Sequence, residues 1–92
     1  MKYIIFTAGD GTPRCVLFGV PITHQAMADA HSPLGWRPHS AGFIEPLGLG
    51  KVRCFGRSES LNLGPAQFDE SLIEVVMSAT LRIAPQSVEA AR

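Results

Sequence analysis

The residues with the clearest potential for chemistry lie at positions 56–60, G-R-S-E-S, which nearly match the G-x-S-x-G elbow of serine hydrolases. Such an elbow presents a nucleophilic serine on a tight turn and needs a glycine on each side of it. Here Ser60 stands where the second glycine belongs. The base would be His24 or His39, and no spacing supports either role. We interpret Ser58 and Ser60 as the end of a strand with hydroxyls bonded to nearby backbone, and we expect no catalytic residue.

A metal site is the second chemistry to consider, because the chain has two cysteines and three histidines: Cys15, Cys54, His24, His31 and His39. Structural zinc sites usually show paired ligands two to four residues apart, and none of these five residues is paired in that way. Isolated cysteines are more often small buried hydrophobic residues. We therefore expect no metal and no cofactor, and cysteines that stay reduced.

Composition limits the function further. The chain has 92 residues, 46% of them hydrophobic and 17% charged, and its formal net charge is zero. This balance favours one globular domain and disfavours nucleic-acid binding, which normally requires a basic excess on one face. The N-terminal apolar run is too short for a signal peptide, and no stretch approaches the roughly 20 apolar residues of a membrane span. We expect a cytoplasmic protein with no membrane contact, a domain over residues 1–83 and a flexible tail over 84–92.

Four strands are predicted. Residues 2–7 are rich in β-branched and aromatic residues, residues 14–19 resume as an apolar strand, and Asp10-Gly11 between them suits a hairpin turn. Both strands are apolar on both faces, which favours positions in the middle of a sheet or covered on both sides. Residues 40–45 and 51–57 predict a second hairpin, because the glycine-rich connection between them is too short for a parallel crossover.

Two helices complete the prediction. Thr23 is a suitable cap for a short helix over residues 24–31. A long helix is predicted to begin at Pro65 and to end at Pro85. Its apolar residues recur at helical spacing: Phe68, Leu72, Val75 or Val76, Ala79 and Ile83. The expected fold class is α+β, in the order β-β-α-β-β-α, with a four-stranded mainly antiparallel sheet and the long C-terminal helix packed on one face.

Three segments carry a resemblance to a known group of proteins. They are K-Y-I-I-F…G-D-G…R-C-V-L-F at the N-terminus, H-S-A-G-F at residues 39–43, and F-G-R-S-E-S-L-N-L-G at residues 55–64. Together these segments resemble small uncharacterised proteins encoded by bacteriophages and prophages, with S-A-G-F and S-x-S-L-x-L motifs, over most of positions 1–75. The resemblance implies a phage context, hence the host cytoplasm, and implies no catalytic residue.

That context suggests a non-enzymatic protein that acts by contact with a host or phage protein, such as an inhibitor of a CRISPR-like defence system. One long helix covers only one face of a sheet, so the other face must be covered by the short helix, by the loop around Trp36, or by another chain. A homodimer is therefore also expected. The candidate partner-contact residues are Arg53, Phe55, Arg57, Glu59 and Trp36. The alternatives are a nucleic-acid-binding accessory protein that uses the basic face of residues 51–57, a structural homodimer, and a small enzyme.

Overall fold

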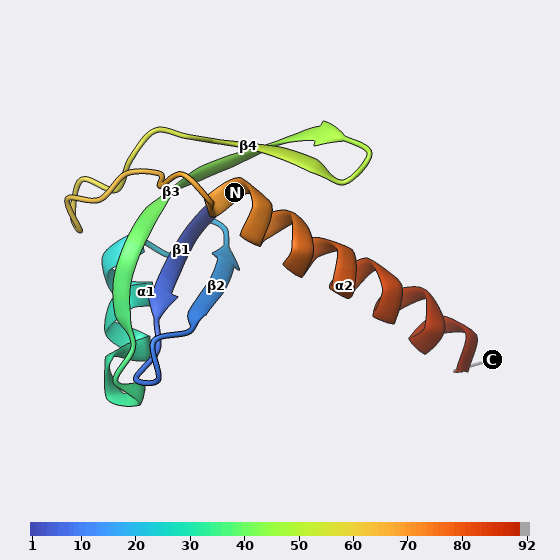
Figure 1. Cartoon of the computed structure of the whole chain (residues 1–92), viewed down its shortest axis with the longest axis horizontal. Coiled ribbons are helices and arrows are strands. Elements are labelled where there is room, and N and C mark those ends of the chain that lie inside the picture. The colour runs from blue at the N-terminus through green and yellow to red at the C-terminus, as the bar shows by residue number, and fades with distance from the viewer. Residues whose placement is uncertain (91–92) are drawn as a thin grey trace.

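The computed structural model describes residues 1–90, with side chains described through residue 79. The chain folds as an α+β domain with a four-stranded antiparallel sheet and two α-helices, as the sequence predicts (Figure 1). The elements are β1 (Lys2–Thr7), β2 (Pro13–Phe18), α1 (His24–His31), a 3₁₀ turn (Ser32–Leu34), β3 (Arg37–Gly48), β4 (Lys51–Phe55) and α2 (Asp69–Ala90). No helix in the described part of the chain is long and apolar enough to cross a membrane.

The sheet has the strand order β2-β1-β3-β4, and every neighbouring pair is antiparallel. Both predicted hairpins are therefore confirmed. β1 is central, and four consecutive residues of it are buried, from Tyr3 to Phe6. Of the two alternatives for β2, a position in the middle of the sheet is wrong, because β2 lies at one edge. Its residues do contact the cores on both faces, as the other alternative stated, although the strand is only half-buried. Its apolar composition reflects contact with both cores and does not mark a central position.

β3 is longer than the predicted residues 40–45, because its two halves have different partners. Its first half pairs with β1 and its second half pairs with β4, with Phe43 at the junction. The second half and β4 form a hairpin that leaves the other strands (Figure 1). β4 ends at Phe55 and not at Arg57, since Gly56 adopts a φ of 67° and turns the chain out of the ladder.

The helix boundaries agree with the sequence for α1 and differ for α2. α1 spans the predicted residues, and the hydroxyl of Thr23 accepts the Ala26 amide at 3.1 Å. α2 begins at Asp69, four residues after Pro65, because residues 66–69 form a turn closed by the Asp69 amide on the Ala66 carbonyl. The structure continues α2 through Pro85 to Ala90, and the expected tail over residues 84–92 stays a prediction.

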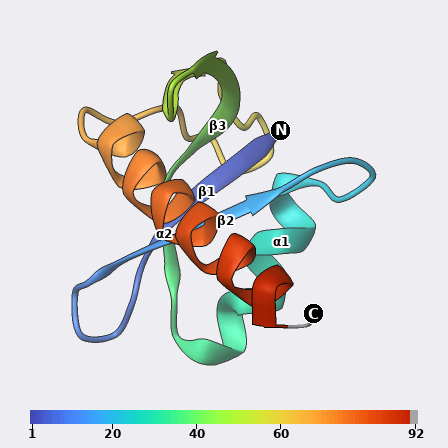
Figure 2. The same cartoon turned by 90° about the vertical axis from the view of Figure 1, so that its right-hand side faces the viewer.

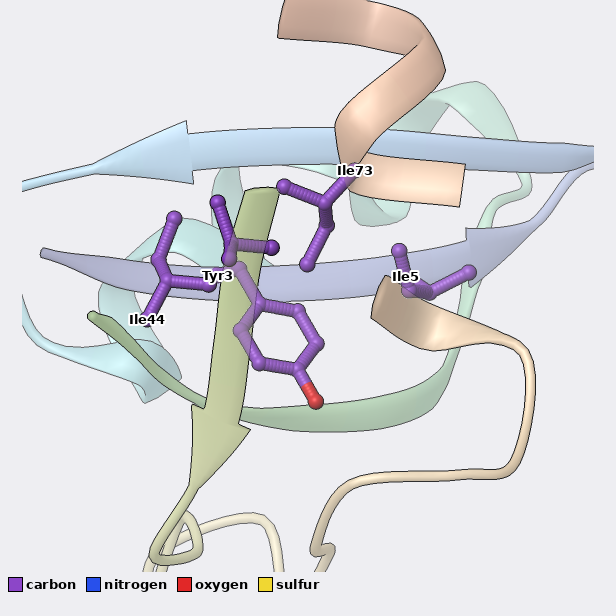
Figure 3. Close-up of a cluster of buried hydrophobic side chains, with 5 residues drawn as sticks. Tyr3, Ile5, Ile44 and Ile73 are labelled. Atoms are coloured by element: carbon purple, nitrogen blue, oxygen red, sulfur yellow. The ribbon is translucent and has the colours of Figure 1, made fainter. Parts of the chain in front are cut away.

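Each face of the sheet has its own hydrophobic core. Under α2 the core consists of Tyr3, Ile5, Ile44, Val52 and Ile73 (Figure 3). On the opposite face, which α1 covers, it consists of Ile4, Phe6, Phe18, Ala28 and Ala41. Trp36, Leu61 and Leu63 pack against this second core beside α1. The chain therefore closes its second sheet face with its own residues, which is one of the alternatives left open by the sequence. Figure 2 shows α2 lying across the sheet on one side and α1 behind it.

Candidate contact surfaces

The serine of the elbow-like stretch has a structural position. Ser58 is buried, at 1% exposure, and its backbone forms an isolated antiparallel bridge with Leu63. Its hydroxyl oxygen accepts the Leu61 amide at 3.3 Å, the local bond expected from the sequence. This turn brings Leu61 and Leu63 onto the core under α1. The S-x-S-L-x-L motif thus holds a loop that covers the second sheet face.

The cysteines and histidines are spread over the fold. Cys15 and Cys54 are free thiols that lie on opposite edge strands, half-buried against the core under α2. Burial raises the pKa of Cys15 to about 11 and also raises the pKa of Cys54, so both thiols stay protonated near neutral pH. The His24 ring is buried and contacts the Gly42 carbonyl at 3.0 Å through Nε2. Within residues 1–79, no three potential ligands gather to hold a metal ion.

The S-A-G-F motif at residues 40–43 also has an architectural role. Ala41 is fully buried in the core under α1, and its amide donates to the Gly64 carbonyl at 3.3 Å. A Cβ on Gly42 would lie 2.8 Å from the Phe55 carbonyl oxygen, so only glycine allows β3 and β4 to approach so closely here. The motif joins the two halves of the sheet and supplies no chemistry of its own.

A buried polar cluster at the start of α2 was not predicted from the sequence. The Asp69 carboxylate, 2% exposed, accepts the Tyr3 hydroxyl at 2.6 Å, the Ser40 hydroxyl at 2.9 Å and the Ala66 amide at 2.9 Å. Figure 3 shows the Tyr3 ring within the core, with its oxygen at the outer end. Burial, followed by the hydrogen bond to Asp69 and its negative charge, raises the pKa of Tyr3 above its ordinary range. The cluster attaches α2 to β1 and β3.

The predicted contact residues Arg53 and Phe55 lie side by side on one face of β4. The Arg53 guanidinium lies 4.8 Å from the centre of the Phe55 ring, which in turn stacks on Phe43 with the ring centres 5.8 Å apart. Arg53 also forms an ion pair with Glu45 on β3, and its Nε donates to Glu45 Oε2 at 3.2 Å. We call these four residues the hairpin face: Phe43, Glu45, Arg53 and Phe55. Glu45, Arg53 and Phe55 are exposed on this face, whereas Phe43 is half-buried and also contacts His24 of α1, with the ring centres 5.5 Å apart.

The other predicted contact residues divide between two places. Arg57 and Glu59 follow β4 in the next loop, with Arg57 Nε 3.8 Å from Glu59 Oε1 and its guanidinium bonded to Asn62. Trp36 lies at the far end of β3, next to the residues that pair with the end of β1. There it stacks on His31 and contacts Phe6, with ring centres 5.3 and 5.8 Å apart. Arg57 and Glu59 border the hairpin face, whereas Trp36 belongs to the core under α1.

A second surface lies between α2 and the edge strand β2. Six residues line a hollow of about 130 Å³ there, and we call it the α2–β2 groove: Ile5, Pro13, Cys15, Leu72, Val75 and Val76. A larger hollow of about 390 Å³ shares three of these residues and reaches Phe68 and His39. Phe68 and Val75 are 65% and 70% exposed. The predicted apolar stripe of the long helix therefore points only partly at the sheet, and the fully buried contact of the helix is Ile73, which the predicted stripe did not include.

α2 forms side-chain hydrogen bonds to one edge strand of the sheet, β4. Glu70 Oε2 accepts the Cys54 amide at 2.8 Å, and Glu74 Oε2 accepts the Val52 amide at 3.0 Å. Lys51 lies 3.6 Å from Glu74 and balances its charge. These carboxylates occupy outward-facing amides of β4. In the described part of the chain, no side chain bonds to the backbone of β2 in the same way.

Comparison with known proteins adds no further assignment, because no protein-family model, curated protein or solved structure matches the chain. The surfaces described above are therefore the basis for any functional proposal. Sequence reasoning identified Arg53 and Phe55 but missed Phe43 and Glu45, their partners across the hairpin. The four-residue separation of Glu70 and Glu74 was a signal for a shared helix face, although their target on β4 could not be read from it.

Proposed function

We propose that this protein is a protein-binding module that uses the hairpin face as its contact surface. The observation that carries the proposal is the Arg53 guanidinium placed over the Phe55 ring, on the face of β4 opposite to the core under α2. Arginine and aromatic residues are enriched in the energetically dominant centres of protein interfaces. Glu45 and Phe43 hold both side chains in place, so little side-chain freedom is lost on binding.

The charges of the hairpin face favour a protein partner over a nucleic acid. Glu45 pairs with Arg53, and Glu59 lies beside Arg57, so both arginines near this surface have an acidic neighbour. A site for nucleic acid would need unpaired cations along a backbone track. The resemblance to phage proteins supports a host protein as the partner, and a CRISPR-type defence complex is the specific form of this proposal. The competing nucleic-acid function would depend on the same Arg53 and Phe55.

The test is a pull-down with the tagged full-length chain from bacterial lysate, with and without expressed defence complexes. We expect one partner in stoichiometric amount. Substitution Phe55→Ala should weaken its binding about 30-fold or more, since truncation of a dominant interface residue costs about 2 kcal/mol. Arg53→Ala should act in the same direction. The matched control is Arg37→Ala, an exposed arginine at the opposite end of β3.

Circular dichroism of each variant separates loss of binding from loss of folding. The proposal fails if no partner is retained, or if the Phe55 and Arg53 variants, folded, retain it as well as the wild type does. Binding of single-stranded nucleic acid that falls steeply with added salt and requires Arg53 would instead support the alternative function.

A further inference from the structure

The outer edge of β2 has no hydrogen bond from the side chains of residues 1–79, unlike that of β4. β2 is a six-residue terminal strand whose pairing with β1 has no register shift, so its outer edge is regular. Natural proteins usually protect such an edge with charges, bulges or a covering element. On β4 the carboxylates of Glu70 and Glu74 provide that protection. Among the side chains of residues 1–79, the only comparable features on β2 are Pro13 and Arg14, both at the first end of the strand.

The groove beside this edge accepts only an uncharged occupant. All six residues that line the α2–β2 groove are uncharged. The one carboxylate in the adjoining hollow, Asp69, is buried and already accepts three hydrogen bonds. A charged segment in the groove would therefore lose its hydration without gaining a partner. What fits is an extended, apolar strand that pairs with β2 through its main chain.

This chain itself contains a segment that meets the requirement. β2 carries the run C-V-L-F, which is extended, apolar and free of charge. We propose that a second copy of the chain is the occupant, so that two β2 strands pair antiparallel about a two-fold axis and join two sheets into one. The uncharged groove supports a symmetric contact, because a two-fold axis brings the same surface of both copies together, and a surface with one sign of charge would repel itself.

The symmetry has a definite geometric consequence. Antiparallel pairing of two identical strands requires an axis perpendicular to the sheet, which places both α2 helices on the same face. The two grooves then form one continuous apolar seam, and Val75 of each copy becomes buried. An axis at Val16 sets Arg14 opposite Phe18 of the second copy and keeps the two Arg14 side chains apart. The dimer uses a surface separate from the hairpin face, so each proposal can fail without the other.

Light scattering after gel filtration, over a micromolar to millimolar range of the full chain, tests the proposal. We expect the wild type to change from one chain to two with rising concentration. Val75→Lys should raise the dissociation constant about 100-fold or more, because it places a cation from each copy in an apolar seam. Val20→Lys is the matched control, since Val20 is 87% exposed and lies outside the groove. It should dimerise like the wild type.

Val75 is exposed in the single chain, so Val75→Lys should fold, and circular dichroism verifies this. Should it not, Val75→Gln, which adds no charge, gives the same comparison with a smaller expected shift. Hydrogen exchange in the wild type adds a local readout: the amides of β2 should gain protection with concentration, and those of β4 should not. A single-chain mass at millimolar concentration overturns the proposal. A dimer unaffected by Val75→Lys, a dimer equally weakened by Val20→Lys, or a monomer that instead captures an unrelated apolar peptide also overturns it.

Discussion

The two sides of α2 contact the sheet by opposite means. On the β4 side, Glu70 and Glu74 occupy backbone amides of the edge strand. On the β2 side, Leu72 and Val75 line an apolar groove beside an edge that no side chain of residues 1–79 caps. One helix thus closes one edge of the sheet and leaves the other available. The difference shows that a neighbouring helix protects an edge strand only where its side chains can accept the free backbone amides of that strand, as carboxylates can and apolar residues cannot.

Between the row of Glu70 and Glu74 and the row of Leu72 and Val75, a third row of residues on α2 fixes the rotation of the helix about its axis. Asp69, Ile73 and Met77 are spaced four residues apart and contact the core under α2. Since Asp69 is bonded to both Tyr3 and Ser40, it sets which row faces β4 and which faces β2. The contrast between the two edges therefore depends on one buried carboxylate.

The largest expected effect is that of Asp69→Ala. It removes the shared acceptor of the Tyr3 and Ser40 hydroxyls and leaves both buried, which should lower the free energy of unfolding by about 3–5 kcal/mol. Chemical denaturation measures the change. Asp69→Asn, which keeps one carbonyl oxygen, should lose less. Asp29→Ala is the control, because this exposed aspartate on α1 accepts only from Gln25 and should cost no more than about 0.5 kcal/mol. Equal losses at both positions would show that the cluster does not anchor α2.

The next effect is smaller and depends on pH. Tyr3→Phe removes one hydrogen bond to Asp69 and should cost about 2 kcal/mol at neutral pH. The pKa of Tyr3 is raised in the folded chain, so above pH 10 the unfolded chain releases the phenol proton while the folded chain retains it. Wild-type stability therefore falls as the pH rises above about 10, and the variant has no phenol to lose. The difference between the two proteins should shrink with alkaline pH, in denaturation curves measured at pH 8 and above.

The raised pKa of Cys15 also lowers stability at alkaline pH, but it does so in both proteins and cancels in the difference. A gap between wild type and Tyr3→Phe that stays constant from pH 8 upward would contradict an anchoring bond between the Tyr3 hydroxyl and Asp69.

Local patterns predicted much of this fold. A run of β-branched and aromatic residues gave β1, an apolar run gave β2, Asp10-Gly11 gave their turn, where Gly11 has a φ of 85°, and Thr23 gave the start of α1. The position of β2 at an edge was missed, because an apolar edge strand that contacts two cores has the same composition as a central strand. The start of α2 was missed for a related reason. Pro65 suits a first helical position, but the Asp69 carboxylate accepts the nearby Ala66 amide and the distant Tyr3 hydroxyl, which places the first turn later.

The candidate sites were predictable to the extent that they lie within one strand. Residues two apart in a strand share a face, so the strand prediction alone puts Arg53 and Phe55 together. Their partners Phe43 and Glu45 depend on the register of β3 against β4, which no local pattern specifies. The same limit applies to the carboxylates of α2. Acidic residues early in a helix interact favourably with the helix dipole wherever they point, and the amides that these two accept lie on a distant segment.

The smallest expected effect tests the edge contrast itself. Glu70→Gln and Glu74→Gln each remove the negative charge of the carboxylate but keep an oxygen that can accept an amide of β4. Each should lower the free energy of unfolding by about 1 kcal/mol or less. Glu74→Gln should cost more, because the Glu74 side chain is less exposed and also pairs with Lys51. In hydrogen exchange, the Val52 and Cys54 amides should lose protection while the amides of β2 stay unchanged. If the amides of β2 and β4 change protection equally in these variants, the protection of β4 comes from packing under α2. The difference between the two edge strands would then depend on the apolar residues of α2 alone.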